Sequence, residues 1–304
     1  MRLLRMVAGL ALPTLFCLIS MQAQLILPED GETLPTFEVA TIKPAPADAH
    51  MTRMNWVSEG PQMDNVALGE IIRDAYDAHS KAQLVGGPQA LLEQRFDLRT
   101  KIDPADVAKL KTMSPNERSR RVRLMLQALL RDRFQLKMHV EKRELPVYAL
   151  VVAKGGPKLK PTAPPDSMPA PQTQAVTHTP GSPGHPSPRP PKGMHWSMGS
   201  SWKWAHMDVS GGTMEELAAA LTGREETRGR LVIDRTGLTG RYDWYLAWTP
   251  PQAEMEPKAS GSSPGADAPG LFTAIREQLG LRLESQKGPV QVVVIDRLEP
   301  PSPN

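Results

Sequence analysis

A proline-rich stretch in the middle of the chain constrains its fold more than any other feature. Twelve of the 31 prolines in this 304-residue chain lie between Pro157 and Pro191, interleaved with Ser, Thr, Gly, Gln and Ala. Each proline removes a backbone N–H and biases the preceding residue toward extended conformations. Such a stretch cannot bury enough apolar surface to offset its ordering entropy. It predicts a disordered linker over residues 156–195 that joins two folded parts.

Helical and strand-like patterns follow the same order on both sides of this linker. Before it, we expect a helix over Leu68–Tyr76, a strand over Arg95–Leu98, a helix after the N-cap Ser114 and a strand over Phe134–Val140. After it, we expect a helix after the N-cap Thr213, strands over Leu231–Asp234 and Arg241–Trp244, a helix over Leu271–Leu279 that Gly280 ends, and a strand from Leu281. The shared order predicts an internal repeat. The alternative is that any two α+β units show a similar order.

Each half is therefore expected to be a small, mostly antiparallel sheet covered by helices, an α+β arrangement. The first module spans residues 36–155 and the second residues 196–299, with a flexible insertion over residues 250–270. Polar residues 141–144 and 286–288 are typical of turns, so we expect a hairpin at each. Phe37–Lys43 alternates as a strand, and the sequence leaves open with which half it pairs.

The first residues have the order of a signal peptide. Arg2 and Arg5 precede a short apolar run, and Ala23 is a small residue suited to cleavage. We expect residues 1–23 to be removed and the protein to be periplasmic or secreted. Lipidation at Cys17 and a retained leader are the alternatives. No other stretch reaches the ~20 apolar residues that cross a bilayer, so no membrane span is expected in the mature chain.

Charge and cysteine content exclude several classes of protein. The 36 Lys and Arg face 33 Asp and Glu, a formal net charge of +3. This is not the clustered basic excess on which nucleic-acid binding depends. Cys17 is the single cysteine, which excludes disulfide scaffolds and Cys-rich zinc modules.

Common catalytic and metal-binding motifs are absent from the sequence. No two of the seven histidines have the spacing of a zinc protease helix, and no G-x-S-x-G elbow occurs. The turn Gly237–Gly240 lacks the lysine of a phosphate-binding loop. We therefore expect no cofactor, no metal and no catalytic residue, and favour a non-enzymatic protein.

Two carboxylates offer the main alternative to that interpretation. Asp97 and Asp243 occupy corresponding places in the two halves, so a pseudo-twofold relation would bring them together. A hydrolase using Asp97 and Asp243 would need both groups to share one proton. The sequence lacks the Asp-Thr/Ser-Gly turn that holds such a pair. The other interpretation is that each aspartate accepts backbone N–H bonds beside its strand.

Tryptophans give the clearest candidate for a ligand surface. Five of the six lie in the second half, and Trp202, Trp204, Trp244 and Trp248 form our tentative ligand surface. Residues two or four apart share one face of a strand. An exposed aromatic face stacks sugars or binds a protein partner, whereas burial in the core of the sheet is the alternative.

Several motifs together resemble a known family. They are FEVATIKP, RFDLRTK after a GGP turn, LVIDRTGLTGRYDWYL, LFTAIREQLGLRLE and the terminal VVVIDRLEPPSPN. They are similar to an uncharacterised soil-associated protein family abundant in Acidobacteria, over most of residues 36–304. The resemblance implies an exported protein without established activity, in a family whose domain is sometimes fused to membrane metallopeptidase sensors. It implies no catalytic residues.

The sequence thus favours an exported, non-catalytic binding or envelope-signalling module that acts through protein–protein contacts. An envelope protein is the expected partner, and an exposed sheet edge in either module would take a partner strand. One alternative is a module that binds cell-wall glycan through its tryptophan-rich face. The hydrolase using Asp97 and Asp243 is the other.

Overall fold

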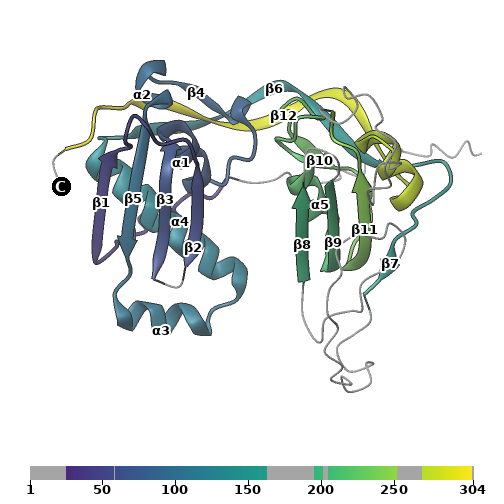
Figure 1. Ribbon diagram of the computed structural model, residues 1–304, viewed down its shortest axis with the longest axis horizontal. Coiled ribbons are helices and arrows are strands. Elements are labelled where there is room, and N and C mark those ends of the chain that lie inside the picture. The colour runs from purple at the N-terminus through teal and green to yellow at the C-terminus, as the bar shows by residue number, and fades with distance from the viewer. Residues whose placement is uncertain (1–24, 58, 163–194, 201–204, 252–268, 303–304) are drawn as a thin grey trace, which may run out of the picture.

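The computed structural model describes residues 25–57, 59–162, 195–200, 205–251 and 269–302. The leader, nearly all of the proline-rich linker and most of the predicted insertion lie outside these residues. The described chain is α+β with mostly antiparallel sheets, which confirms the predicted fold class (Figure 1).

The first half contains strands β1 to β7 and helices α1 to α4. In chain order these are β1 (Val39–Pro44), β2 (Arg53–Val57), β3 (Gly60–Ala67), α1 (Leu68–Ala75), the 3-10 turn η1 (Lys81–Gln83), β4 (Leu84–Gly86), α2 (Gln89–Glu93), β5 (Arg95–Lys101), α3 (Pro104–Thr112), α4 (Pro115–Arg133), β6 (Lys137–Val152) and β7 (Lys160–Pro161). An antiparallel sheet has the order β1-β5-β3-β2. The Phe37–Lys43 pattern thus yields β1, which pairs within the first half.

The second half repeats much of this order. Its elements are β8 (His195–Ser200), β9 (Ala205–Gly212), α5 (Met214–Leu221), β10 (Val232–Asp234), β11 (Tyr242–Trp248), α7 (Leu271–Ala274), one π-helical turn η3 (Ile275–Leu279) and β12 (Leu281–Arg297). The antiparallel sheet has the order β7-β11-β9-β8. The prediction of an internal repeat stays a prediction, supported by this matching order.

A third sheet, with the order β10-β6-β12-β4, connects the two halves. Strands β6 and β12 pair antiparallel from Lys137 opposite Arg297 to Val152 opposite Leu281. Strand β4 of the first half pairs parallel with β12, and β10 of the second half pairs parallel with β6. Each half therefore adds a short strand to the long strand of the other. In Figure 1 this ribbon crosses above both smaller sheets.

This ribbon shows that the two predicted hairpin turns are wrong. Residues 141–144 and 286–288 lie inside β6 and β12, where Glu141 pairs with Val292 and Glu144 with Pro289. A third hydrophobic core, which includes Val147, Val290 and Val292, packs against the middle of the ribbon, and the polar side chains there remain partly or fully exposed without ending the strands. The polar residues alone predicted turns. The partner strand that keeps these residues in a ladder lies far along the chain, so no local pattern revealed it.

Helix boundaries follow the predicted capping residues. Ser114 accepts a hydrogen bond from the N–H of Glu117, and Thr213 accepts one from the N–H of Glu216. Gly280 ends the helical segment in the left-handed conformation, with φ of 64°. These local predictions are confirmed.

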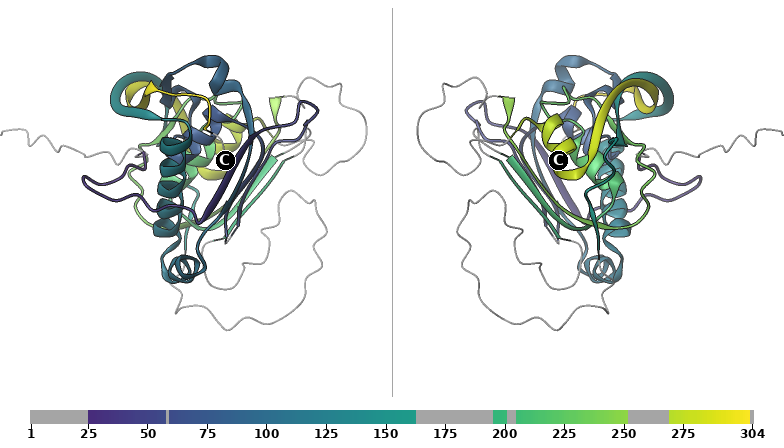
Figure 2. Two further views of the ribbon diagram at one scale, coloured as in Figure 1. Left: turned by 90° about the vertical axis from the view of Figure 1, so that its left-hand side faces the viewer. Right: turned by 90° about the vertical axis from the view of Figure 1, so that its right-hand side faces the viewer.

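Strands and helices form separate layers. Helices α1 and α4 cover one face of the first sheet, and α5 with α7 covers one face of the second, each closing a hydrophobic core. Viewed along the long axis, the strands of both sheets slant alike on one side of α4 (Figure 2). On the opposite faces, polar side chains such as Arg95 and Arg99 of β5 and His206 and Asp208 of β9 are partly or fully exposed. None of the described helices combines the length and hydropathy needed to cross a bilayer.

Candidate functional site: the edge strand β2

Strand β2 forms the edge of the first sheet that lies nearest the second half (Figure 1). It pairs with β3 through a short turn, with Arg53 opposite Asp64 and Val57 opposite Gly60. Gly60 has φ of 125°, and a Cβ there would lie 2.5 Å from the Thr100 Oγ1. A glycine is therefore required for this turn to pack against the sheet.

Apolar side chains on β2 are unusually exposed. Among the described residues, four of the six large exposed hydrophobic side chains fall between positions 51 and 57. Their exposed fractions are 72% for Met51, 37% for Met54, 43% for Trp56 and 45% for Val57. We call these four residues, with Arg53 and Asn55 between them, the β2 surface. An apolar cluster of this kind marks an interaction site more often than an isolated exposed side chain does.

One face of the β2 surface continues the apolar core. Met54 pairs with Met63, which is fully buried, so both side chains lie on the helix-covered face of the sheet. Trp56 lies on the same face, and the Arg123 guanidinium from α4 stacks 5.3 Å from the centre of its ring. Arg123 in turn pairs with Asp77 at 2.9 Å, which holds it over the indole.

The other face carries an excess of guanidinium groups. Arg53 and Arg99 both contact the carboxylate of Asp64, Arg53 at a long 3.9 Å and Arg99 through a short hydrogen bond. Arg99 is also fixed by hydrogen bonds to the carbonyl oxygens of Met63 and Leu98. The weaker contact of Arg53 leaves its side chain 57% exposed and within reach of a further carboxylate.

Apart from β8, the other described edge strands are shorter than β2 or contain a proline. Strand β1 ends in Pro44, β7 has only two residues and includes Pro161, and β4 and β10 have three residues each. Prolines and short length are common means of blunting an edge. Strand β2 has five residues, no proline and exposed apolar side chains. On β8, at the facing edge of the second sheet, the side chains lie outside the description.

The tentative tryptophan surface is placed only in part. Trp202 and Trp204 lie outside the described residues. Trp244 and Trp248 share one face of β11, as their spacing indicated, and that face is turned to the core, with 6% and 1% of each side chain exposed. These two rings therefore present no free face for stacking on a sugar.

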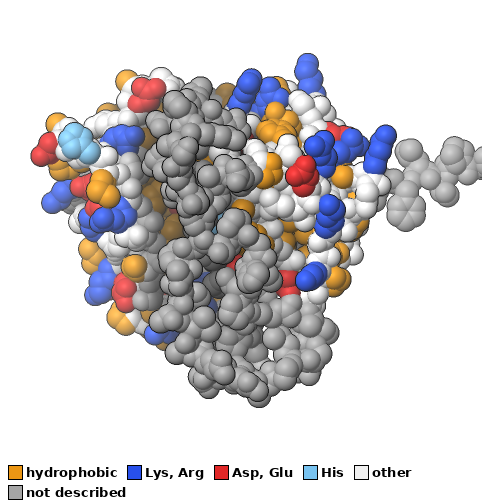
Figure 3. Space-filling view, turned by 45° about the vertical axis from the view of Figure 1, so that its right-hand side comes forward, with side chains coloured by type: hydrophobic (Ala, Val, Ile, Leu, Met, Phe, Trp, Pro, Cys, Tyr) orange, Lys and Arg blue, Asp and Glu red, His pale blue; other side chains and the backbone are white. Residues whose placement is uncertain are grey.

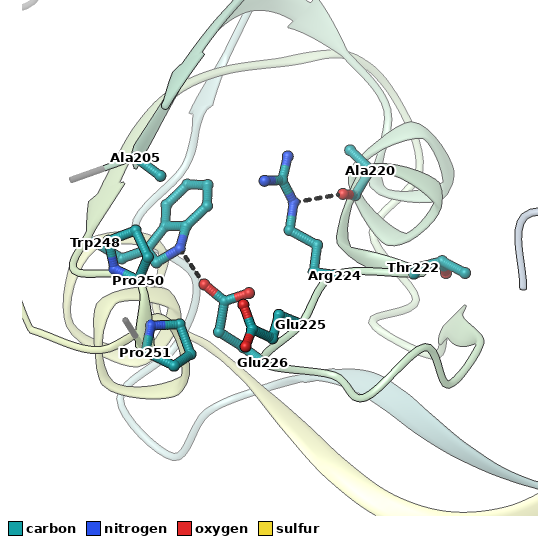
Figure 4. A pocket seen from close by; sticks show the side chains of 10 residues that line it. Ala205, Ala220, Thr222, Arg224, Glu225, Glu226, Trp248, Pro250 and Pro251 are labelled. Carbon is teal, nitrogen blue, oxygen red and sulfur yellow. Dashed lines mark hydrogen bonds between the residues drawn. The ribbon is translucent and has the colours of Figure 1, made fainter. Parts of the chain in front are cut away.

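Trp248 forms the wall of an open cavity of about 420 Å³ (Figure 4). Its Nε1 donates to a carboxylate oxygen of Glu226 at 2.6 Å, and the Arg224 guanidinium lies 5.0 Å from its ring centre. Arg224 also donates from Nε to the Ala220 carbonyl oxygen, and burial lowers its pKa. Three of the side chains that line this cavity, Trp248, Glu226 and Arg224, thus contact one another or the backbone.

Asp97 and Asp243 hold corresponding positions on β5 and β11, in separate sheets. Oδ1 of Asp97 accepts the N–H of Asn65 at 2.8 Å, and Oδ1 of Asp243 accepts the N–H of Gly211 at 2.9 Å. Asp243 also accepts from the hydroxyls of Thr162 and Ser210. Each carboxylate thus fixes the neighbouring strand, as the second interpretation of these aspartates predicted.

Charge and metal ligands do not single out another site. Lys and Arg side chains are mixed with acidic and hydrophobic ones over the visible face in Figure 3. Within the described ranges, no three His, Cys, Asp or Glu side chains are grouped to hold a metal ion. His139 lies between Asp296 and Glu141 on the ribbon, and these hydrogen bonds raise its pKa.

Comparison with known proteins places the chain in a family. The model of a family described as "Protein of unknown function (DUF3738)" matches residues 69–298. The chain belongs to the DUF3738 family. The DUF3738 match runs from α1 to the end of β12, so it includes the second half and the first half from α1 onward, and β1 to β3 lie before it. Neither a curated protein nor a solved structure matches the chain.

Sequence reasoning overlooked the β2 surface. Trp56 is the tryptophan outside the cluster in the second half, and the alternation of polar and apolar residues beside it is short, from Arg53 to Trp56. The signal that was present is a five-residue segment of β-compatible residues without acid or proline, directly before a turn at Gly60.

Proposed function

We propose that this protein is an exported, non-catalytic binding module that takes an extended segment of a partner protein along the edge of β2. Strand addition at a sheet edge gives affinity through backbone hydrogen bonds and specificity through alternate side chains. The observation that carries the proposal is the β2 edge itself, which has four exposed apolar side chains on or directly before the strand and no proline. The leader-like order of residues 1–23 supports export into a compartment where such a partner would be met.

Site-specific photocrosslinking tests this proposal. A photoreactive residue at Asn55, whose side chain is exposed, should capture a distinct protein in the envelope of the producing cell. The same residue at Lys43, on the edge strand β1, is the matched control and should not capture it. Recovery of the same proteins from both positions, or of none, would contradict the proposal.

A backbone variant then tests whether capture depends on strand addition. Met54 lies opposite Met63, and two positions along the same ladder Trp56 lies opposite Pro61, which has no N–H to donate, so both of these pairs are of the non-hydrogen-bonded kind. Alternation of hydrogen-bonded and non-hydrogen-bonded pairs therefore directs the backbone N–H of Met54 outward. Met54→Pro should abolish capture at Asn55 while circular dichroism shows an unchanged fold. Unchanged capture would show that the partner binds without adding a strand.

A further inference from the structure

We infer that the β2 surface selects a partner segment in which apolar side chains on alternate positions meet Met54 and Trp56 and an acidic side chain meets Arg53. This inference rests on the proposed strand addition and specifies its partner. It follows from the two faces of β2 and from the charges beside them.

The apolar half of this specificity comes from the pairing register. A strand added to β2 places every second side chain on the helix-covered face, beside Met54 and Trp56. Both are more than a third exposed, although their row of the sheet runs through Met63 and Leu98, which are buried. Apolar partner side chains at these positions would extend the core by one strand.

The acidic half comes from the opposite face. Arg53 and Arg99 share the single carboxylate of Asp64, and Arg53 holds it only at 3.9 Å. A partner side chain opposite Arg53 lies on this same face, beside the Arg53 guanidinium. An acidic residue there gains a charge-assisted hydrogen bond, whereas a basic residue would add a third cation.

A second copy of the chain fits this surface less well. The segment His50–Val57 contains no acidic residue, so antiparallel pairing of this segment with its own copy brings no carboxylate to Arg53. Pairing centred on Asn55 sets Arg53 opposite Val57 of the other copy. The charge of this edge therefore favours a different protein with acidic residues in an extended segment.

Selection from a random nine-residue peptide library displayed on phage tests the inference with the full chain as bait. Peptides enriched on the wild type should alternate apolar residues and carry Asp or Glu at one fixed position, about fivefold over Lys and Arg, as for an exposed ion pair. Arg53→Glu should reverse this preference to Lys or Arg at the same position. Trp56→Ala should remove the enrichment, and Phe272→Ala, which truncates an equally exposed aromatic residue on α7, should leave it unchanged.

The possible outcomes separate the inference from the proposed function. Enrichment that needs Trp56 but shows no charge preference, or does not respond to Arg53→Glu, overturns the acidic partner and leaves strand addition standing. Enrichment that survives Trp56→Ala and also Met54→Pro overturns the acidic partner and strand addition together. The absence of any enrichment has the same consequence. A dimer in sedimentation that Met54→Pro dissociates would show that a second copy occupies the edge, and would also overturn the inference.

Discussion

At the scale of single residues, two aspartates show how one carboxylate fixes a neighbouring strand. The ladder between β3 and β5 is irregular between Met63 and Val66, and the ladder between β9 and β11 is irregular next to Asp243. At both places a backbone N–H, of Asn65 or of Gly211, turns to the aspartate. The carboxylate thus replaces a missing backbone acceptor, which a buried N–H requires.

Removing either carboxylate should destabilise the fold. Asp97→Ala leaves the N–H of the buried Asn65 without its acceptor. Asp243→Ala removes the acceptor of three donors, which are the hydroxyls of Thr162 and Ser210 and the N–H of Gly211. We expect each change to lower the free energy of unfolding by about 1–3 kcal/mol in urea titrations. Asp48→Ala, at an exposed position in the turn after β1, is the control and should cost less than about 0.5 kcal/mol. An equal loss of unfolding free energy in all three variants would show that Asp97 and Asp243 have no special role beside their strands.

Asp74 on α1 should make stability depend on pH. Burial raises its pKa from 3.8 to about 6, although the positive charge of Arg123 acts against this, and Asp77 and Arg73 also face it. A carboxyl with a raised folded pKa binds its proton more tightly in the folded state, so stability falls as the pH rises from about 4 to about 6. The loss is at most roughly 3 kcal/mol, since one pKa unit is about 1.4 kcal/mol.

The comparison of wild type with Asp74→Asn isolates this contribution. Because the other titrating groups are common to both proteins, the difference in unfolding free energy should change between pH 4 and pH 6 in favour of Asp74→Asn. Urea titrations at pH 4, 5, 6 and 7 measure it. A difference that is constant over this range would show that Asp74 keeps its ordinary pKa in the folded protein.

At the scale of elements, sequence predicted the local features and missed the long-range ones. Capping at Ser114 and Thr213 and the stop at Gly280 depend on side chains and φ angles within a few residues, so they are legible in the sequence. The β6–β12 ribbon depends on a partner far along the chain, which no local pattern reveals. Trp56 was missed for the same reason, because exposure at a sheet edge is a property of the assembled sheet.

Gly280 provides a sharp test at the end of a helix. Its φ is 64°, and a Cβ there would lie 2.1 Å from the carbonyl oxygen of Gly156. Gly237 has a similar φ of 68° with nothing within 4 Å of a Cβ, so it is the matched control. Gly237→Ala should cost about 1 kcal/mol of unfolding free energy from the backbone alone. Gly280→Ala should cost at least about twice as much in the same urea titrations, and equal costs would mean that the approach of Gly156 is not required.

At the scale of the whole molecule, the two halves are joined by exchanged strands rather than by the linker alone. Strand β4 pairs with β12, and β10 pairs with β6. The connections before these short strands also meet, since the hydroxyl of the buried Ser80 donates to the carbonyl oxygen of Gly229 at 2.5 Å. The third sheet needs strands from both halves, so we expect the protein to unfold as one cooperative unit.

Cutting the chain within residues 163–194 tests this cooperativity. With a protease site inserted there, the cut fragments should stay together in gel filtration, because the β6–β12 ladder and both exchanged strands lie outside the cut region. The cut protein should unfold in a single thermal transition whose midpoint rises with protein concentration, whereas that of the uncut protein should not change. Separation of the fragments, or two transitions, would show that each half folds on its own and that the shared sheet adds little to stability.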